Sequence, residues 1–310
     1  MFQDISQSYK AALRLWLPLV SAHVFIRMVV ASLMVPVIGF LLASTLVFSD
    51  QTALTDQDIA WFLLTPAGAV GALIILSFMI VAMVLDVVMA TAILRQRPLG
   101  LMETLRLASG FVLHSIPRLL PFVAQFLFRV LLILLPYLAV AGAVAFVFLS
   151  EHDINYYLSQ RPPDFLIAAG LIGLVVLALA VTLLARLSGW AVALHLALFD
   201  AVPPARAFDE SRRQMTGHRW PLIQRLLVWI AVRAVAGLCV GAIAGLVVTW
   251  IGSWQADSLR TLAIAVILGG VLYSAANALI NAVSNGALAD VLNDAFERAL
   301  FGRKPTLDMD

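Results

Sequence analysis

Residues 151–165 have the sequence EHDINYYLSQRPPDF and lie between two long apolar runs, from Leu119 to Leu149 and from Leu166 to Phe199. Each run is long enough to cross a bilayer as a helix, because about 20 apolar residues span the hydrocarbon core. The stretch itself is polar and contains Pro162 and Pro163, and proline is well tolerated at the first position of a helix. The pattern therefore predicts a transmembrane helical hairpin with residues 151–165 at its tip.

Two further features of this stretch fit the tip of a hairpin. Tyr156 and Tyr157 combine an apolar ring with a polar hydroxyl group, which suits the membrane–water interface. Four polar side chains could bind a divalent cation at this tip: Glu151, His152, Asp153 and Asp164. Capping of the flanking helices and stiffening of the turn explain the same residues, and we favour that role. We therefore predict no metal site and no cofactor.

The composition of the whole chain favours a membrane protein. Of the 310 residues, 62% are hydrophobic and 12% are charged, and the mean hydropathy is +0.98. A soluble domain carries about 25% charged residues. The net charge of +2 is too small to indicate a nucleic acid as partner. The single cysteine, Cys239, excludes a disulfide bond or a cysteine-pair metal site within one chain.

Apolar runs and their boundary signals predict an all-α bundle of six transmembrane helices. We expect these spans at about residues 18–48, 66–94, 121–149, 163–199, 221–252 and 260–290. Three amphipathic helices are expected at the membrane surface, over residues 4–16, 95–118 and 203–215. Pro117 and Pro121 should end the second of these, and the last helix should continue to Leu300.

The same elements suggest an internal repeat. Residues 1–300 form the expected membrane domain and residues 301–310 a tail. An interfacial helix, a proline and a helical hairpin recur in three units, over residues 4–94, 100–199 and 203–300. The spacing between the units is irregular, so chance recurrence is an equal alternative.

Basic residues predict the orientation of the bundle. Among the 20 Lys and Arg residues, Arg161 and Arg260 lie in loops on one side, and most others lie on the side of the termini. Cytoplasmic loops are enriched in Lys and Arg. We therefore expect both termini in the cytoplasm, the three interfacial helices on the same side, and a location in the cytoplasmic (inner) membrane of a bacterium.

The order of residues 151–165 is more specific to one protein family than their composition is. The run EHDINYYL, followed after two residues by RPP, an acid and Phe, resembles a hallmark of the membrane domain of glycerophosphoryl diester phosphodiesterases. That family more often has Glu at the position of Asp164. Residues 58–68 and 205–220 also fit, and the resemblance covers about residues 5–300. The hallmark residues of the turn are Glu151, His152, Asp153, Asn155, Tyr156, Tyr157, Arg161, Pro162 and Pro163.

The resemblance implies a role in lipid metabolism. In that family this region usually precedes a soluble catalytic domain, and these 310 residues show neither such a domain nor an H-R-G motif. We therefore expect a non-catalytic membrane module, with no catalytic residues of its own. It would bind or present anionic lipid headgroups or glycerophosphodiesters, or recruit a separate phosphodiesterase protein. The alternatives are a transporter or channel for a small anion or lipid, and a structural assembly factor.

Arginines within the spans indicate where an anion could bind. The expected spans contain a single acid, Asp86, which is the candidate ion-pair partner. They contain five arginines: Arg27, Arg129, Arg186, Arg225 and Arg233. A charge inside the bilayer is costly unless it meets a partner or water. Arg186 and Arg225 lie close enough to span ends to reach the interface. We expect Arg27, Arg129 and Arg233 to converge on an anion or a lipid headgroup.

Polar residues along the sixth span could complete that site. Spacings of three and four place Ser274, Asn277, Asn281, Ser284 and Asn285 on one helix face. Asn277, Asn281 and Asn285 are the candidate ligands. Hydrogen bonding between helices, worth about 0.6 kcal/mol for each bond, is the simpler explanation and the one we favour.

Overall fold

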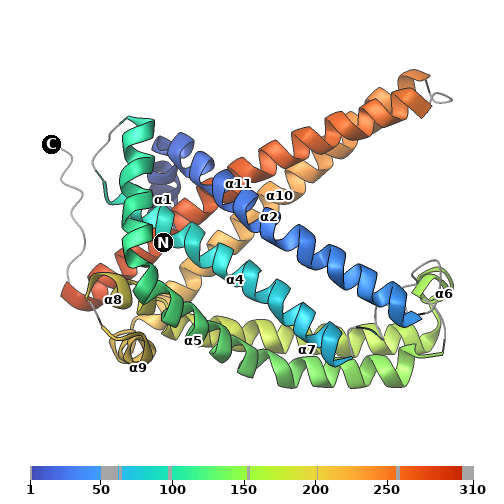
Figure 1. Ribbon diagram of the computed structural model, residues 1–310, viewed down its shortest axis with the longest axis horizontal. Helices are drawn as coiled ribbons and strands as arrows, with labels where there is room; N and C mark the ends of the chain where they lie inside the picture. The colour runs from blue at the N-terminus through green and yellow to red at the C-terminus, as the bar shows by residue number, and fades with distance from the viewer. Residues whose placement is uncertain are drawn as a thin grey trace. The chain divides into compact units, whose positions relative to one another are not determined.

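The computed structural model describes residues 2–49, 62, 65–96, 100–151, 154–200, 202–255 and 259–301. Its helices are α1 (Phe2–Arg14), α2 (Trp16–Ser49), α4 (Pro66–Leu94), α5 (Leu101–Leu149), α6 (Ile154–Gln160), α7 (Pro163–Gly189), α8 (Ala193–Phe199), α9 (Pro204–Gln214), α10 (Arg219–Gly252) and α11 (Leu259–Phe301), with a 3-10 turn, η1 (Ser253–Gln255) (Figure 1). The described ranges contain no strand. The predicted all-α class is confirmed.

Six candidate spans are long and apolar enough to cross a membrane, as predicted. They are Trp16–Leu46, Pro66–Leu94, Leu101–Leu149, Pro163–Phe199, Arg219–Gly252 and Leu259–Ala299. Side chains with large apolar groups remain exposed along them, such as Phe40 and Leu238. Such surfaces are typical of helices that face lipid rather than water. The protein is an all-α polytopic membrane protein.

The boundary expected at Pro117 and Pro121 is wrong. α5 continues for 49 residues through both prolines and through Pro136. A proline removes one backbone hydrogen bond, but membrane helices tolerate this loss because neighbouring groups satisfy the freed carbonyl. The expected connector helix and the third span are therefore one continuous helix.

The helix that follows the hairpin tip begins where the sequence predicts. α7 begins at Pro163, with Pro162 in extended backbone conformation before it. Arg161 adopts a positive φ of 47°, which few residues other than glycine adopt. α7 ends at Gly189, and a short turn separates it from α8, so the fourth span is interrupted near its end. The last helix, α11, extends to Phe301, slightly beyond the predicted Leu300.

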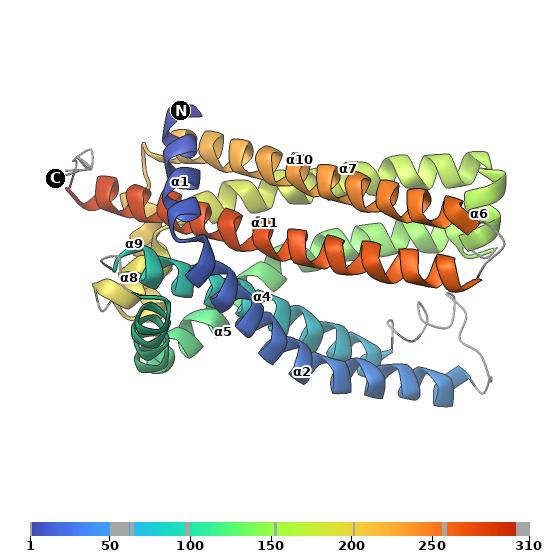
Figure 2. The same ribbon diagram turned by 90° about the horizontal axis from the view of Figure 1, so that it is seen from above.

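The chain divides into two compact units, each built from separate stretches. The first unit comprises Met1–Arg27, Val84–Ile116 and Glu210–Asp310. In it α10 and α11 run side by side, and α1 packs against both of them (Figure 2). Gly286 of α11 permits this approach, because a side-chain Cβ there would lie 2.8 Å from Leu19 Cδ1 and 3.1 Å from Ala12 Cβ.

The second unit comprises Met28–Met83 and Pro117–Asp209. The far half of α5 and α7 form the hairpin on either side of α6, and the hydroxyl groups of Tyr137 and Thr182 bond across it at 2.7 Å. These two units cut across the three repeat units expected from the sequence, which stay a prediction.

Candidate functional site

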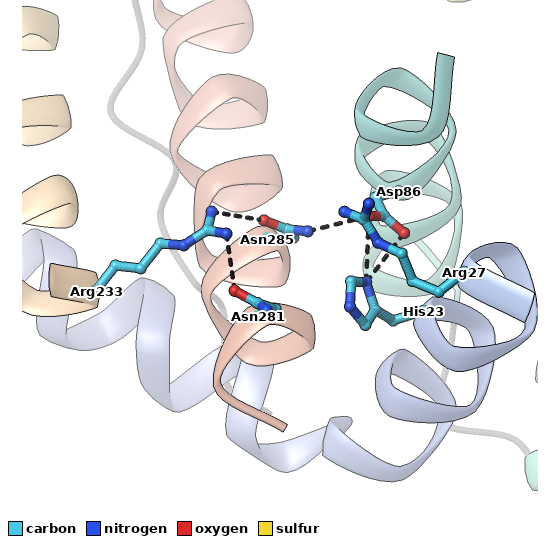
Figure 3. A network of polar contacts seen from close by, with 6 residues as sticks. All are labelled: His23, Arg27, Asp86, Arg233, Asn281 and Asn285. Atoms are coloured by element: carbon cyan, nitrogen blue, oxygen red, sulfur yellow. Dashed lines mark hydrogen bonds and ion pairs between the residues drawn. The ribbon is translucent and has the colours of Figure 1, made fainter. Parts of the chain in front are cut away.

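A polar network lies inside the first unit, at a level where the helices are otherwise apolar. Figure 3 shows its six side chains, which come from four helices: His23 and Arg27 from α2, Asp86 from α4, Arg233 from α10, and Asn281 and Asn285 from α11. The C-terminal part of α4 positions the acid, because nearly all of its residues are buried, among them Val88 and Ile93.

Asp86 is the acid of this network. One of its carboxylate oxygens accepts a hydrogen bond from Arg27 Nη2 at 3.1 Å, and His23 Nδ1 lies 3.1 Å from the same oxygen. Nδ1 must carry the proton, because an ionised carboxylate only accepts. The side chain of Asp86 is 2% exposed and that of Arg27 is 47% exposed. Arg27 can therefore reach the surroundings of the bundle, whereas Asp86 depends on its partners.

Asn285 connects this acid to a second arginine. Its Nδ2 donates to Asp86 Oδ2 at 3.3 Å, and its Oδ1 accepts from Arg233 Nη1 at 3.4 Å. The carboxylate fixes this orientation, because only the NH₂ group of the amide can donate to it. The buried amide therefore presents its oxygen to Arg233.

Arg233 is held without an acid. Its Nη2 donates to Asn281 Oδ1 at 2.7 Å, and its guanidinium lies over the Trp229 ring at 5.4 Å. Trp229 is itself fixed by a 2.7 Å hydrogen bond from its Nε1 to the Ser284 carbonyl. Within the described part of the chain, no carboxylate lies within 4.0 Å of Arg233. Neutral amides therefore position the guanidinium and leave its charge in place.

Tyr9 of α1 adds another neutral neighbour. Its hydroxyl group donates to Ser284 Oγ at 3.4 Å. Burial raises the pKa of the Tyr9 phenol, while the bond to Ser284 and the charge of Arg233 oppose this rise. The phenol stays protonated at neutral pH and supplies no negative charge to Arg233.

A groove opens beside Arg233 between α10 and α11. It has a volume of about 510 Å³, and its lining includes Trp229, Arg233, Asn277 and Asn281. Asn277 makes no hydrogen bond with any described residue. A separate cavity of about 10 Å³ lies against His23, Asp86 and Asn285, about the smallest space that holds one water molecule. Two polar sites of different size thus lie on either side of Asn285.

A second cluster joins α1 to α10 and α11. Arg225 is 7% exposed and contacts Asp4 Oδ2 at 3.1 Å as well as Asp294. Arg298 contacts the other oxygen of Asp294 at 2.8 Å. Both acids lie outside the expected spans, Asp4 in the helix expected at the membrane surface, so the expectation that Arg225 reaches the interface stays a prediction.

Arg129 belongs to the second unit, whereas the network belongs to the first. Its Nη1 donates to Gln125 Oε1 at 3.1 Å, and its guanidinium lies over the Phe208 ring at 4.2 Å. Of the three arginines expected to converge, Arg27 and Arg233 therefore belong to one network within the first unit. Among the three candidate asparagines, Asn281 and Asn285 bond to Arg233, and Asn277 lines the groove next to it.

The described residues of the hairpin tip differ in exposure. Tyr156 is exposed, whereas Tyr157 is buried against the Phe165 ring at 6.0 Å, so only Tyr156 has the exposure expected at the interface. His152 and Asp153 lie outside the described residues, and exposed positions are found for Glu151, Asn155, Arg161 and Pro163. In the described part of the chain, no three His, Cys, Asp or Glu side chains group as metal ligands do.

Sequence reasoning missed His23 and Trp229. The signal for His23 was available, because it precedes Arg27 by four residues and so shares its helix face. Trp229 likewise precedes Arg233 by four residues. The ion pairs of Arg225 were not predicted either, because a sequence does not show that Asp4 and Asp294 lie beside it.

Comparison of the chain with protein-family models, with curated proteins and with solved structures finds no match.

Proposed function

We propose that this protein is a non-catalytic membrane module that binds the phosphate of an anionic phospholipid headgroup in the groove between α10 and α11. The observation that carries the proposal is Arg233. It lines this groove with no carboxylate in direct contact among the described residues, because its neighbours there are neutral amides and an aromatic ring.

The hydrogen-bond inventory of Arg233 supports an external ligand. A guanidinium has five N–H donors. Asn281 and Asn285 accept from Nη2 and Nη1, and no other acceptor among the described residues is within reach. Donors left without an acceptor inside a bilayer are costly. A ligand oxygen in the groove would remove this cost.

A phosphate, the anionic group that phospholipid headgroups share, matches the geometry of the groove. The planar guanidinium binds phosphate oxygens in pairs, and such charge-assisted bonds strengthen away from water. Asn277 would donate a further, uncharged hydrogen bond from the opposite helix. The groove walls also include Ile230 and Ile280, which suit the acyl or glycerol part of a lipid.

The resemblance of residues 151–165 supports a place for this binding in phosphodiester metabolism. In this proposal the module presents lipid headgroups or glycerophosphodiesters to a separate phosphodiesterase protein. The chemistry of bond cleavage would then belong to that partner, and this chain would supply location and ligand.

Replacing Arg233 by leucine is expected to lower the amount of anionic phospholipid that co-purifies, because Arg233 is the charged side chain among the described residues that line the groove. Mass spectrometry of lipids bound to the purified protein measures this. Arg186→Leu is the matched control, since it removes the same charge from an exposed position of α7, and it should keep the lipid. Unchanged anionic lipid in Arg233→Leu would overturn the proposal.

The source of the phosphate can be tested with the same variant. Wild-type protein in nanodiscs of phosphatidylcholine, supplied with inorganic phosphate or glycerol phosphate, is compared with protein in nanodiscs that contain phosphatidylglycerol. If the groove binds a lipid headgroup, the protein is protected from thermal unfolding only in the nanodiscs that contain phosphatidylglycerol. Arg233→Leu loses that protection. Anion flux into proteoliposomes would instead favour the transporter alternative.

The proposed orientation predicts the labelling pattern of introduced cysteines. In a Cys239→Ala background, a membrane-impermeant maleimide should label Ser159→Cys in intact cells and Thr216→Cys only after permeabilisation, because the excess of basic loops places α9 in the cytoplasm. Both positions are exposed. The reverse pattern would contradict the proposed topology.

A further inference from the structure

Arg129 has the same construction as Arg233, in the other unit of the protein. Each guanidinium lies over an aromatic ring, at 4.2 Å for Phe208 under Arg129 and at 5.4 Å for Trp229 under Arg233. Each also donates a hydrogen bond to a side-chain amide oxygen, which for Arg129 belongs to Gln125. Two arginines of separate units are thus positioned by an aromatic face and an amide.

The aromatic support of Arg129 is rigid. Phe208 is 1% exposed and stacks on Phe122, with ring centroids 4.9 Å apart. Trp190 meets Phe208 edge to face at 5.6 Å. A ring fixed on several sides holds the guanidinium plane by a cation–π contact. One face of Arg129 is therefore covered, and its N–H edge is left for other partners.

The donors of Arg129 are mostly unused. Only its Nη1 bonds to a described residue, and the described part of the chain places no carboxylate within 4.0 Å of it. Arg129 lies 20 residues before the end of α5 at Leu149, which is about 30 Å along the helix. That distance is about the full thickness of the hydrocarbon core, so the half-buried guanidinium of Arg129 would lie near the level of the lipid phosphates, whose oxygens can accept from its remaining donors.

From these observations we infer that Arg129 is a second binding site for a phosphate-bearing anion, separate from the groove at Arg233. Phe208 and Gln125 hold the guanidinium, and its free edge bonds two oxygens of one phosphate. Each unit of the protein then holds one anion. The inference rests on the geometry of Arg129 and extends the proposed function without depending on occupancy at Arg233.

Counting bound anions tests the inference. Native mass spectrometry is applied to wild-type protein, Arg129→Leu, Arg233→Leu and the double variant, each released from nanodiscs that contain phosphatidylglycerol. We expect two bound anionic lipids in the wild type, one in each single variant and none in the double variant. Inorganic phosphate with phosphatidylcholine nanodiscs forms the second arm, in which bound phosphate instead of lipid identifies a free anion as the ligand.

The outcomes separate this inference from the proposed function. A full count of two in Arg129→Leu overturns the second site and leaves the Arg233 site standing. A count of two in Arg233→Leu, with a lower count in Arg129→Leu, overturns the Arg233 site and leaves the Arg129 site standing. A wild-type count of one, lost in either single variant, overturns separate sites in favour of one shared pocket. Phe208→Leu, which keeps the charge but removes the aromatic support, should weaken the Arg129 site alone, whereas Trp229→Leu should weaken only the other.

Discussion

Replacing Arg27 by leucine is expected to lower the free energy of unfolding by about 2–3 kcal/mol, below the cost of breaking a fully buried ion pair because the Arg27 side chain is 47% exposed. The reason is the exposure of the two partners. The side chain of Asp86 is 2% exposed, so its carboxylate keeps only His23 and the Asn285 amide when Arg27 is lost. Neither of these compensates a buried charge as an arginine does.

The reverse substitution should be milder. Asp86→Leu leaves Arg27, whose side chain is 47% exposed and can turn its long stem toward the interface. We expect Asp86→Leu to lose about half as much stability as Arg27→Leu. The double variant Arg27→Leu/Asp86→Leu should be more stable than Arg27→Leu alone, because no unpaired charge remains.

Reversible denaturation in detergent micelles measures these three free energies. Asp164→Leu is the control, because Asp164 is exposed in the first turn of α7 and an acid there contributes at most about 1 kcal/mol. A double variant as unstable as Arg27→Leu would contradict the argument, since the damage would then come from lost packing and not from a stranded carboxylate.

Hydropathy predicted the fold class and the number of spans because each span is long and apolar by itself. The same reasoning failed at Pro117, because proline ends helices in water but not in a membrane, where the neighbouring structure satisfies the freed carbonyl. The continuation of the last helix past Asp290 and Asp294 was predicted, and α11 extends to Phe301.

The candidate site was only partly predictable for a related reason. A sequence shows which charges lie in spans, and this was enough to select Asp86, Arg233 and the asparagine face. It does not show which helices meet. The contacts of Arg225 with Asp4 at the start of α1 and with Asp294 near the end of α11 could not be predicted from the sequence.

Replacing Arg225 by leucine is expected to release α1 from the first unit. Arg225 is the only residue among the described ion pairs that joins α1 to α10, through Asp4, while it also holds Asp294 of α11. The loss leaves Asp294, whose side chain is 18% exposed, with Arg298 as its remaining basic partner. Because Asp4 is 41% exposed, we expect about 2–3 kcal/mol, somewhat below the cost for a fully buried pair.

Hydrogen exchange of the backbone amides of residues 2–14 measures this release. A loss of 2–3 kcal/mol corresponds to an increase of about 30- to 150-fold in the population of the detached helix. Arg298→Leu is the control, because it removes only the i,i+4 contact with Asp294 and should change the stability by about 0.3–0.5 kcal/mol. Arg225→Leu/Asp294→Leu should recover part of the protection, since the double variant no longer contains the Asp294 carboxylate that lost one of its two basic partners. If α1 exchanges no faster in Arg225→Leu than in wild type, the buried contacts of Ile5 and Ala12 hold it without the ion pairs.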